Sequence, residues 1–320
     1  MRTALVGAVD STRIALEALA EAGHPPLALF TLPPERSARH SDYVDIAPVA
    51  ARHGVRVVPA PNVNAPEVLD ELRRLELDYL MVIGWSQICR PELLGVARRG
   101  SLGSHPAALP QNRGRAVIPW TIIQGIESTG STLFWMDEGV DSGDIIAQEI
   151  FAVDPGETAA TLYEKHLQAV WRLMRAAVPR LAEGTAPRVP QDHARASYCS
   201  RRTADDGLID WSRPAREVWT LIRAAGDPYP GAFTFAGAER IVVREAAYVG
   251  AAPYTGMEGQ VQAVGEEGAL VRGGDGGHVL LRVVQRDGEA PLPAAAVIKN
   301  HVKLGLSLLT LHRMLHKGAV

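Results

Sequence analysis

The stretch TALVGAVDSTRIALEALAEAGHPPLALFT, residues 3–31, decides the fold class. It begins with a short apolar run, Thr3–Val6, continues with apolar residues at helical spacing over Ser11–Glu21, and ends in a second apolar run, Leu27–Thr31. Short continuous apolar runs are typical of buried strands, and apolar residues three to four apart are typical of helices. A strand, a helix and a strand in this order predict a βαβ unit and therefore a parallel sheet.

The same alternation continues as far as residue 105. Helices are predicted over residues 46–53 and 66–75, and strands over 55–58, 79–83 and 100–105. This pattern predicts an α/β domain with a doubly wound, mostly parallel, Rossmann-like sheet and helices on both faces. Ligands of such sheets bind beyond the carboxyl ends of the strands, which is where His105 and the loop that begins at Gly84 are expected.

The second half of the chain has a different pattern. A helix is predicted over residues 158–181, and the prolines and glycine that follow it mark a linker. From Phe233 onward, short strands with glycine turns predict a small antiparallel, OB-like β-barrel. The predicted organisation is a catalytic domain over 1–182, a linker over 183–205, an OB-like domain over 206–305 and a helical tail over 306–320.

Composition narrows the class of protein. The 320 residues carry a net charge of −3 and two cysteines. The small negative charge argues against a nucleic-acid partner, and so few cysteines suit a reducing compartment. No run approaches the roughly 18 apolar residues of a membrane span, so we expect a cytoplasmic protein. His312 and His316 are four residues apart, but with no third ligand nearby they predict a solvated helix face and no metal site.

A second stretch, HPAALPQNRGRAVIPWTIIQGIESTGSTLFWMDEGVDSGD over residues 105–144, carries the candidate chemistry. His105 follows a predicted strand, and Asp141 lies in an acidic, glycine-rich loop. An imidazole can donate to an oxyanion or move protons near neutral pH, and a nearby carboxylate can orient it and accept a proton. The first strand–helix turn, Val6–Ser11, lacks the G-x-G-x-x-G fingerprint of dinucleotide-binding folds.

This stretch, together with RRTADDGLIDWS at 201–212 and DPYPGAF at 227–233, resembles the 10-formyltetrahydrofolate-dependent formyltransferases. That family has an Asn-x-His motif, an Arg-Gly loop and a Gly-x-Asp-x-Gly loop. The resemblance implies transfer of a formyl group from 10-formyltetrahydrofolate to an amine without a metal, with His105 and Asp141 as the catalytic residues. It implies folate contacts from two loops, whose residues are Trp85, Ser86, Gln87, Ile88, Glu138, Gly139, Val140 and Asp144.

The chain departs from the family pattern at one position. Gly103 stands where the family has asparagine, and losing one oxyanion donor typically lowers the rate about 10²–10³-fold. Ser104 and Asn112 are candidate replacement donors, as are the polar residues of the 85–88 loop. The departure leaves open a slow enzyme, altered acceptor chemistry or an inactive protein.

The charged residues of the chain predict which class of molecule accepts the formyl group. Arg113 and Arg115 could grip a substrate carboxylate or phosphate; alternatively, one of them pairs with an acidic loop structurally. The methionyl-tRNA formyltransferases of this family carry a longer basic loop where residues 33–42 here are mixed in sign. We therefore expect a small amine: an amino sugar nucleotide, an amino acid or a biosynthetic intermediate. A methionyl-tRNA formyltransferase, a formate-releasing hydrolase and a non-catalytic folate-binding module are the alternatives, and a homodimer is left open as the assembly.

Overall fold

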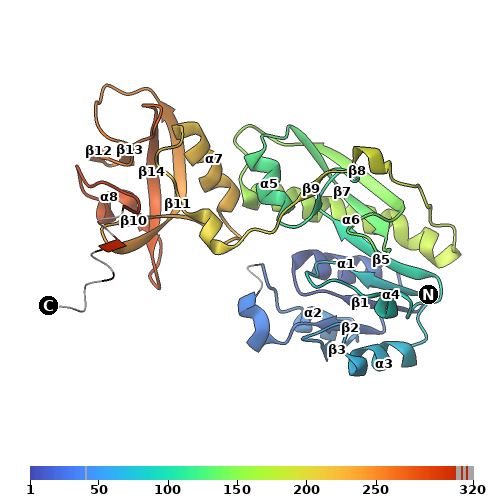
Figure 1. The fold of residues 1–320 in the computed structure, drawn as a ribbon. Coiled ribbons are helices and arrows are strands. Elements are labelled where there is room, and N and C mark those ends of the chain that lie inside the picture. Colours follow the sequence, from blue (N-terminus) through green and yellow to red (C-terminus); the bar gives the residue numbers. More distant parts are fainter. Residues whose placement is uncertain (40–41, 308–310, 313–314, 316–320) are drawn as a thin grey trace. The chain divides into compact units, whose positions relative to one another are not determined.

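The computed structural model describes residues 1–320 except 40–41, 308–310, 313–314 and 316–320. The chain divides into two compact units, each with its own sheet (Figure 1). The first unit comprises residues 1–117, 126–155 and 161–201, and the second comprises 118–125, 156–160 and the chain from 202 onward. The predicted tail helix, including His316, falls mostly outside the described residues.

A seven-stranded sheet with the order β3-β2-β1-β4-β5-β7-β8 organises the first unit. Its strands are β1 (Thr3–Val6), β2 (Ala28–Thr31), β3 (Arg56–Pro59), β4 (Tyr79–Val82), β5 (Gly100–His105), β7 (Ser128–Trp135) and β8 (Ile145–Ala152). Its helices are α1 (Asp10–Glu21), α2 (Ala47–Arg52), α3 (Pro66–Arg74), α4 (Pro91–Leu94) and α6 (Ala159–Glu183), with 3₁₀ turns at Pro34–Arg39 and His193–Arg195.

The mostly parallel sheet predicted from the sequence is confirmed. The five strands from β3 to β5 pair in parallel, whereas β7 and β8 add an antiparallel edge. These two strands were not predicted. Short apolar runs identify strands that are buried on both faces, but β8 has one face exposed and β7 is rich in Ser and Thr.

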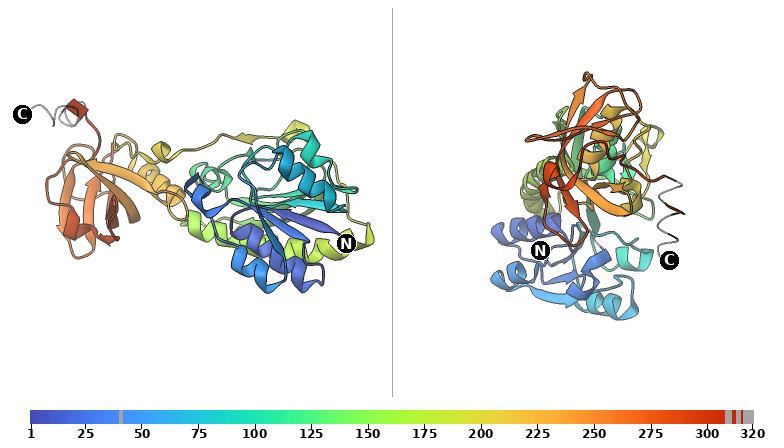
Figure 2. Two further views of the ribbon diagram at one scale, coloured as in Figure 1. Left: turned by 90° about the horizontal axis from the view of Figure 1, so that it is seen from below. Right: turned by 90° about the vertical axis from the view of Figure 1, so that its left-hand side faces the viewer.

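Helices cover both faces of this sheet (Figure 2). On one face, α1, α2 and α6 bury Leu16, Val49 and Leu173 against strand residues such as Leu102. On the other face, α3 and α4 pack against a separate buried cluster that contains Val82. The two layers hold the carboxyl ends of β4 and β5 in place, and the loops that follow these strands carry the predicted site residues.

An antiparallel sheet with the order β10-β11-β14-β13-β12 forms the second unit. Its elements are α5 (Val117–Ile123), a 3₁₀ turn (Ala204–Gly207), α7 (Ala215–Ala225), β10 (Ala232–Ala236), β11 (Glu239–Gly250), β12 (Val261–Gly265), β13 (Gly268–Arg272), β14 (His278–Arg286), β15 (Leu292–Pro293) and α8 (Ala294–Val297). The predicted antiparallel strands are confirmed. Residues Lys303 and Leu304 form bridges beside both edges of the sheet, to Gln260 and Ala236 respectively.

A short parallel pairing between β6 (Arg113–Gly114) and β9 (Tyr198–Cys199) completes the first unit. It joins the Arg-Gly loop to the segment that the sequence predicts as a linker. This pairing brings residues from about position 191 to 199 beside the candidate site.

Candidate functional site

His105 is the last residue of β5, and its side chain is only 6% exposed. Nε2 lies 2.7 Å from the main-chain carbonyl oxygen of Asn112. Because a carbonyl oxygen can only accept, Nε2 carries a proton and donates it in this arrangement. Nδ1 lies 3.5 Å from Oδ2 of Asp141. The structure therefore brings together the two residues that the sequence selects as catalytic, with a carboxylate facing the imidazole.

Asp141 is held by contacts on both its side chain and its main chain. Oδ2 accepts a 2.8 Å hydrogen bond from the Gly114 amide, so the Arg-Gly loop positions the carboxylate. The main chain of Asp141 has a φ of +50°, a left-handed conformation that Asp adopts more readily than most residues. Its carbonyl oxygen accepts a 2.9 Å bond from Nε2 of Gln191, which also donates to the Gly143 carbonyl.

Gln191 is a site residue that the sequence analysis missed. It is buried, and its Oε1 accepts a 2.7 Å hydrogen bond from Nη2 of Arg113. Arg113 is almost fully buried and also donates to the hydroxyl of Tyr198. This geometry favours the structural interpretation of Arg113, because its guanidinium supports the Asp141 loop through Gln191. A glutamine in a proline-rich linker gives no sequence signal for such a role.

Arg115 has different surroundings. Its side chain is exposed, and its amide donates to the carbonyl of Cys199. Among the described residues, none is found as a partner for its guanidinium. Arg115 therefore remains able to meet a ligand, whereas Arg113 is already engaged by the protein.

The two candidate replacement donors lie in unlike positions. Asn112 is buried, with its amide donating to Oγ of Ser197 and its Oδ1 accepting from the same hydroxyl at 3.3 Å. Ser104 lies on β5 between Gly103 and His105, so alternation along the strand turns its side chain toward the opposite face. Of the two, Asn112 contacts the imidazole, and it does so through its main-chain carbonyl.

An aromatic ring occupies the space above Gly103. Gly103 lies directly opposite Phe134 in the β5–β7 pair, and Phe134 is buried. A Cβ on Gly103 would lie 3.2 Å from two atoms of that ring and 3.4 Å from Cγ of Met136. The ring therefore covers the place where a longer side chain would stand on the His105 face of β5.

The loop after β4, predicted to contact folate, is tied to the loop after β3. The Gln87 side chain accepts from the Val63 amide at 3.1 Å and donates to the Pro61 carbonyl at 2.8 Å. Asn64 donates to the Ile88 carbonyl and accepts from the Arg90 amide. These bonds fix the main chain of the loop and engage the Gln87 amide, while Ser86 is exposed at its surface.

Apolar side chains are exposed on both predicted folate loops. Ile88 is 83% exposed and Val140 is 54% exposed, and Glu138 and Gly139 are exposed as well. Trp85 packs on the same buried cluster as Met136, which precedes the second loop. The Trp85 indole N–H is buried without a hydrogen-bond partner among the described residues. Asp144 is half-buried, and its carbonyl accepts from the Trp135 amide.

The Cys89 thiol, which follows the predicted folate loop, is chemically inert at neutral pH. Burial raises the pKa of the Cys89 thiol to about 11, so this cysteine stays protonated at neutral pH. In the part of the chain that the structure describes, no three His, Cys, Asp or Glu side chains are grouped to hold a metal ion.

Among the described residues, none of the helices combines the length and the apolar composition that a membrane-spanning helix requires.

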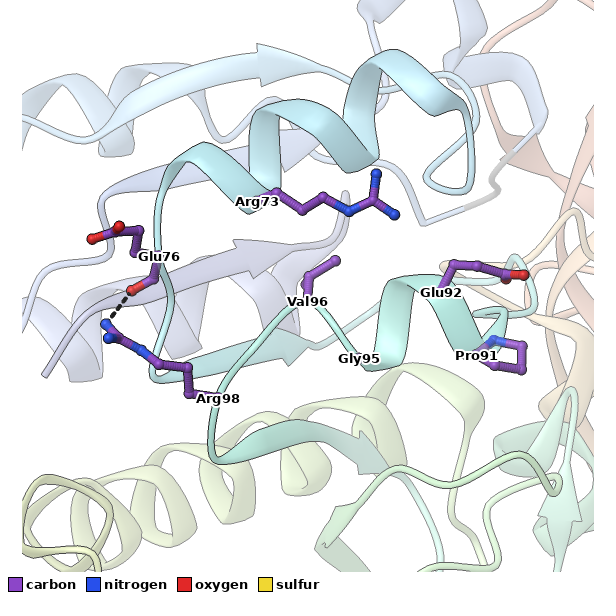
Figure 3. Close-up of a pocket in the computed structure, with 7 residues that line it drawn as sticks. All are labelled: Arg73, Glu76, Pro91, Glu92, Gly95, Val96 and Arg98. Atoms are coloured by element: carbon purple, nitrogen blue, oxygen red, sulfur yellow. Dashed lines mark hydrogen bonds between the residues drawn. The ribbon is translucent and has the colours of Figure 1, made fainter.

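A surface pocket of about 470 Å³ lies away from His105, beside α3 and α4. Figure 3 shows its lining, which includes Arg73, Glu76, Glu92 and Arg98. The pocket contains neither predicted catalytic residue, and it mixes charges of both signs. We therefore place the candidate active site at His105 and Asp141, where the imidazole and the carboxylate meet.

Two family models match the chain. The formyl transferase model matches residues 18–178, and the model of the formyl transferase C-terminal domain matches residues 201–302. The first match alone covers half of the chain. The chain belongs to the formyl transferase family, as the sequence resemblance predicts.

Solved structures share the fold at low identity. HypX from Aquifex aeolicus, solved with tetrahydrofolic acid, is 19% identical with a TM-score of 0.64, over 93% of this chain and 46% of HypX; the chain thus spans about half the length of HypX. WlaRD, a sugar 3N-formyltransferase solved with dTDP and 5-N-formyl-THF, is 17% identical with a TM-score of 0.64, over 91% of this chain and 99% of that protein. The Helicobacter canadensis N-formyltransferase, solved with folinic acid and dTDP-3-aminofucose, is 19% identical with a TM-score of 0.64, over 89% and 99% of the two chains.

Proposed function

We propose that this protein is an N-formyltransferase that moves the formyl group of 10-formyltetrahydrofolate to the amine of a small molecule. The observation that carries the proposal is the buried His105 imidazole facing the Asp141 carboxylate beyond the carboxyl end of β5. Membership of the formyl transferase family supports it. We propose that catalysis belongs to residues 1–182, followed by a linker to 205 and an OB-like domain to 305.

The reaction makes one C–N bond and breaks another. The acceptor nitrogen attacks the formyl carbon, the bond from that carbon to the folate nitrogen breaks, and the proton lost by the amine ends on the folate nitrogen. Bound 10-formyltetrahydrofolate supplies the activated formyl group. We propose that Asp141 accepts the amine proton and that His105 donates to the formyl oxygen, after its Nε2 exchanges the Asn112 carbonyl for that partner.

The loops after β4 and β7 fit a flat, mostly apolar cofactor. Exposed Ile88 and Val140 would bury apolar surface on binding, and the unpaired Trp85 indole N–H would gain an acceptor. Relatives of the same fold were solved with folate compounds. We propose that these loops form the folate site.

The acceptor is proposed to be a small amine, with amino sugar nucleotides as the first class to test. Sugar N-formyltransferases share the fold over almost their whole length. The exposed Arg115 guanidinium suits a phosphate or carboxylate on the acceptor. The net charge of −3 argues against a tRNA acceptor.

A formylation assay with 10-formyltetrahydrofolate tests the proposal. We expect release of tetrahydrofolate that depends on an added amine, with the amine formylated in equal amount. Dose-dependent inhibition by methionyl-tRNA, or its formylation with a steep dependence on salt, would instead support the tRNA enzyme. Tetrahydrofolate and formate appearing at the same rate without amine would indicate a hydrolase.

A non-catalytic folate-binding module is the second candidate. The observation that favours it is that the Phe134 ring lies against Gly103, so that position 103 offers no side-chain amide. Such a module would be stabilised by 5-formyltetrahydrofolate in a thermal-shift titration yet show no turnover with any amine. Stabilisation by NADH without stabilisation by folates would contradict both candidates.

A further inference from the structure

A groove of about 420 Å³ opens at the opposite end of β5 from His105. It is lined by residues around the start of β4 and β5 and the end of α6, among them Tyr79, Arg99, Trp135, Glu183, Gly184 and Arg188. His105 is five residue steps of extended chain from Gly100, which places the groove roughly 17 Å away along the strand. The groove is therefore distinct from the candidate active site.

Two aromatic rings form the floor of the groove. The centroids of Tyr79 and Trp135 lie 5.9 Å apart, and both residues are buried. The Tyr79 hydroxyl donates to the Leu181 carbonyl at 3.0 Å, and the Trp135 indole donates to the Pro187 carbonyl at 2.8 Å. Because each polar tip is satisfied by the protein, the floor is fixed before any ligand arrives.

Two guanidinium groups lie over this floor. The Arg188 guanidinium is 3.9 Å from the Trp135 ring centroid, and that of Arg99 is 6.0 Å from the Tyr79 centroid. Arg188 also donates to the Arg99 carbonyl at 3.3 Å. In the described chain, neither guanidinium has a carboxylate within ion-pair distance, and the nearby Glu183 carboxylate accepts from Thr185 instead. A hydrogen bond with Tyr79 and the charge of Asp78 raise the pKa of Arg99, so its guanidinium is partly engaged, whereas the Arg188 guanidinium donates to one carbonyl and keeps its other donors for a ligand.

Two glycines with positive φ give the groove its shape. Gly184 has a φ of +75°, and a Cβ there would lie 2.8 Å from Nη1 of Arg99. Gly100 has a φ of +124°, and a Cβ there would lie 3.3 Å from the Trp135 ring. Both positions let the guanidinium and the ring come close to the main chain, so the groove depends on residues without side chains.

The pocket in Figure 3 provides a contrast. Its Arg73 pairs with the Asp70 carboxylate at 2.9 Å. Its Arg98 donates to the Glu76 carbonyl at 2.8 Å and lies 4.0 Å from the Asp78 carboxylate. Both arginines of that pocket thus have a carboxylate within ion-pair distance, whereas in the described chain those of the groove have none.

We propose that the groove at the start of β5 binds a small phosphate-bearing ligand, with Arg99 and Arg188 as its anion receptors. Planar guanidinium groups bind phosphate oxygens through paired, charge-assisted hydrogen bonds. A guanidinium stacked on indole keeps its edge donors free for such a ligand. A flat ring on the ligand would stack on the open face of Arg188, so a nucleoside monophosphate should bind more tightly than inorganic phosphate.

Calorimetric titration of the full chain with inorganic phosphate, AMP and adenosine tests this proposal. We expect Arg99→Ala and Arg188→Ala each to weaken AMP and phosphate binding by about tenfold or more, as loss of a charged hydrogen-bond partner predicts. Arg188→Lys keeps the positive charge but loses the planar guanidinium, and it should weaken AMP binding less than Arg188→Ala does. Because this variant is conservative, it also controls for misfolding of Arg188→Ala. Arg73→Ala and Arg98→Ala are matched controls that remove the same charge and should leave binding unchanged.

Four outcomes would overturn the proposal, and the first three concern the titration itself. They are absence of phosphate and AMP binding, equal binding of adenosine and AMP, and equal losses in the groove and control variants. Binding that disappears in His105→Ala would move the anion to the active site and would also overturn it. A formylation assay on Arg99→Ala separates the proposals, because loss of AMP binding with formylation intact leaves the proposed enzyme function untouched.

Discussion

Two buried histidines of the first unit, His105 and His166, have opposite surroundings. Both are nearly inaccessible, at 5% and 3% exposure. His105 has an oxygen facing each ring nitrogen: the Asn112 carbonyl at Nε2 and the Asp141 carboxylate at Nδ1. Each of these oxygens can accept a hydrogen bond, and one of them carries negative charge.

His166, on α6, has mostly apolar surroundings. Nδ1 shares a 2.7 Å hydrogen bond with Ser131 Oγ, and the ring packs edge-on against Phe151 with centroids 5.0 Å apart. In the described chain, Nε2 has no hydrogen-bond partner. Burial, together with the smaller effect of the charge that His105 can carry, lowers the pKa of His166 to about 3.

The comparison shows that burial alone does not identify a catalytic histidine. Two imidazoles of nearly equal exposure differ in whether a carboxylate and a loop converge on them. At neutral pH His166 is neutral and lies on the face of β7 that packs against α6, so it acts as a core residue with one polar tip. His105 lies at the carboxyl edge of the sheet, where ligands of such folds bind.

The largest expected effect separates these two histidines by activity. We expect His105→Ala and Asp141→Asn each to lower amine formylation by at least about a hundredfold, because each removes a proposed donor or base. His166→Asn, which retains a group able to bond Ser131, should change turnover by less than about threefold at pH 7.5. The measurement is kcat and KM for formyl transfer, with folding checked by circular dichroism.

Equal losses of formylation rate in His166→Asn and His105→Ala would show that the two histidines do not differ in function. In that case the buried Ser131–His166 pair would share in the reaction. Wild-type rates in His105→Ala would remove the catalytic assignment from this site altogether.

A smaller effect concerns acid stability. In the unfolded chain His166 takes up a proton below about pH 6.5, whereas in the folded protein its pKa is about 3. The unfolded state therefore binds more protons between these values, and stability is lost as pH falls from 6.5 toward 3. The expected loss is about 1.4 kcal/mol for each pH unit, or about 2 kcal/mol between pH 6.5 and 5.

Urea unfolding of wild type and His166→Asn at pH 7.5, 6 and 5 measures this loss. Carboxylates common to both proteins cancel in the difference, so the wild type should lose its advantage over the variant as pH falls. A difference that stays constant with pH would mean that His166 titrates normally in the fold. It would also weaken the contrast with His105.

The sequence predicted the parallel part of the fold for a physical reason. Strands buried on both faces, such as Thr3–Val6 and Tyr79–Val82, form continuous apolar runs. The two strands of the antiparallel edge were not predicted, because Ile145–Ala152 alternates between exposed and half-buried residues and Ser128–Trp135 is partly polar. Both segments belong to the sheet because they pair with neighbouring strands, and a local sequence pattern does not reveal that pairing.

The candidate site was partly predictable. His105 drew attention because it follows a predicted strand, and Asp141 because it lies in an acidic, glycine-rich loop. The contacts that support His105 and Asp141 could not be predicted from the sequence, because Arg113 and Gln191 are 78 residues apart and meet only through tertiary structure. The sequence left the role of Arg113 open, and its buried contacts now favour a structural role.

The smallest expected effect concerns the space beside His105. Gly103→Ala adds a Cβ that would lie 3.2 Å from the Phe134 ring, so the ring must shift. We expect a loss of about 1 kcal/mol in unfolding free energy, the lower end for overpacking a core. Gly156→Ala is the matched control, because a Cβ there meets nothing within 4 Å.

Phe134→Leu should relieve the crowding, so the double variant should lose less than the sum of the two single variants by about 0.5 kcal/mol or more. Strict additivity would show that Gly103 and Phe134 do not share the space. Gly103, Phe134 and His105 lie on one face of the β5–β7 pair, whereas Ser131 points to the other. Gly103→Ala should therefore alter formylation while leaving the acid sensitivity due to His166 unchanged, and a change in that sensitivity would mean that a substitution on the His105 face of the sheet also alters the packing around His166 on the other face.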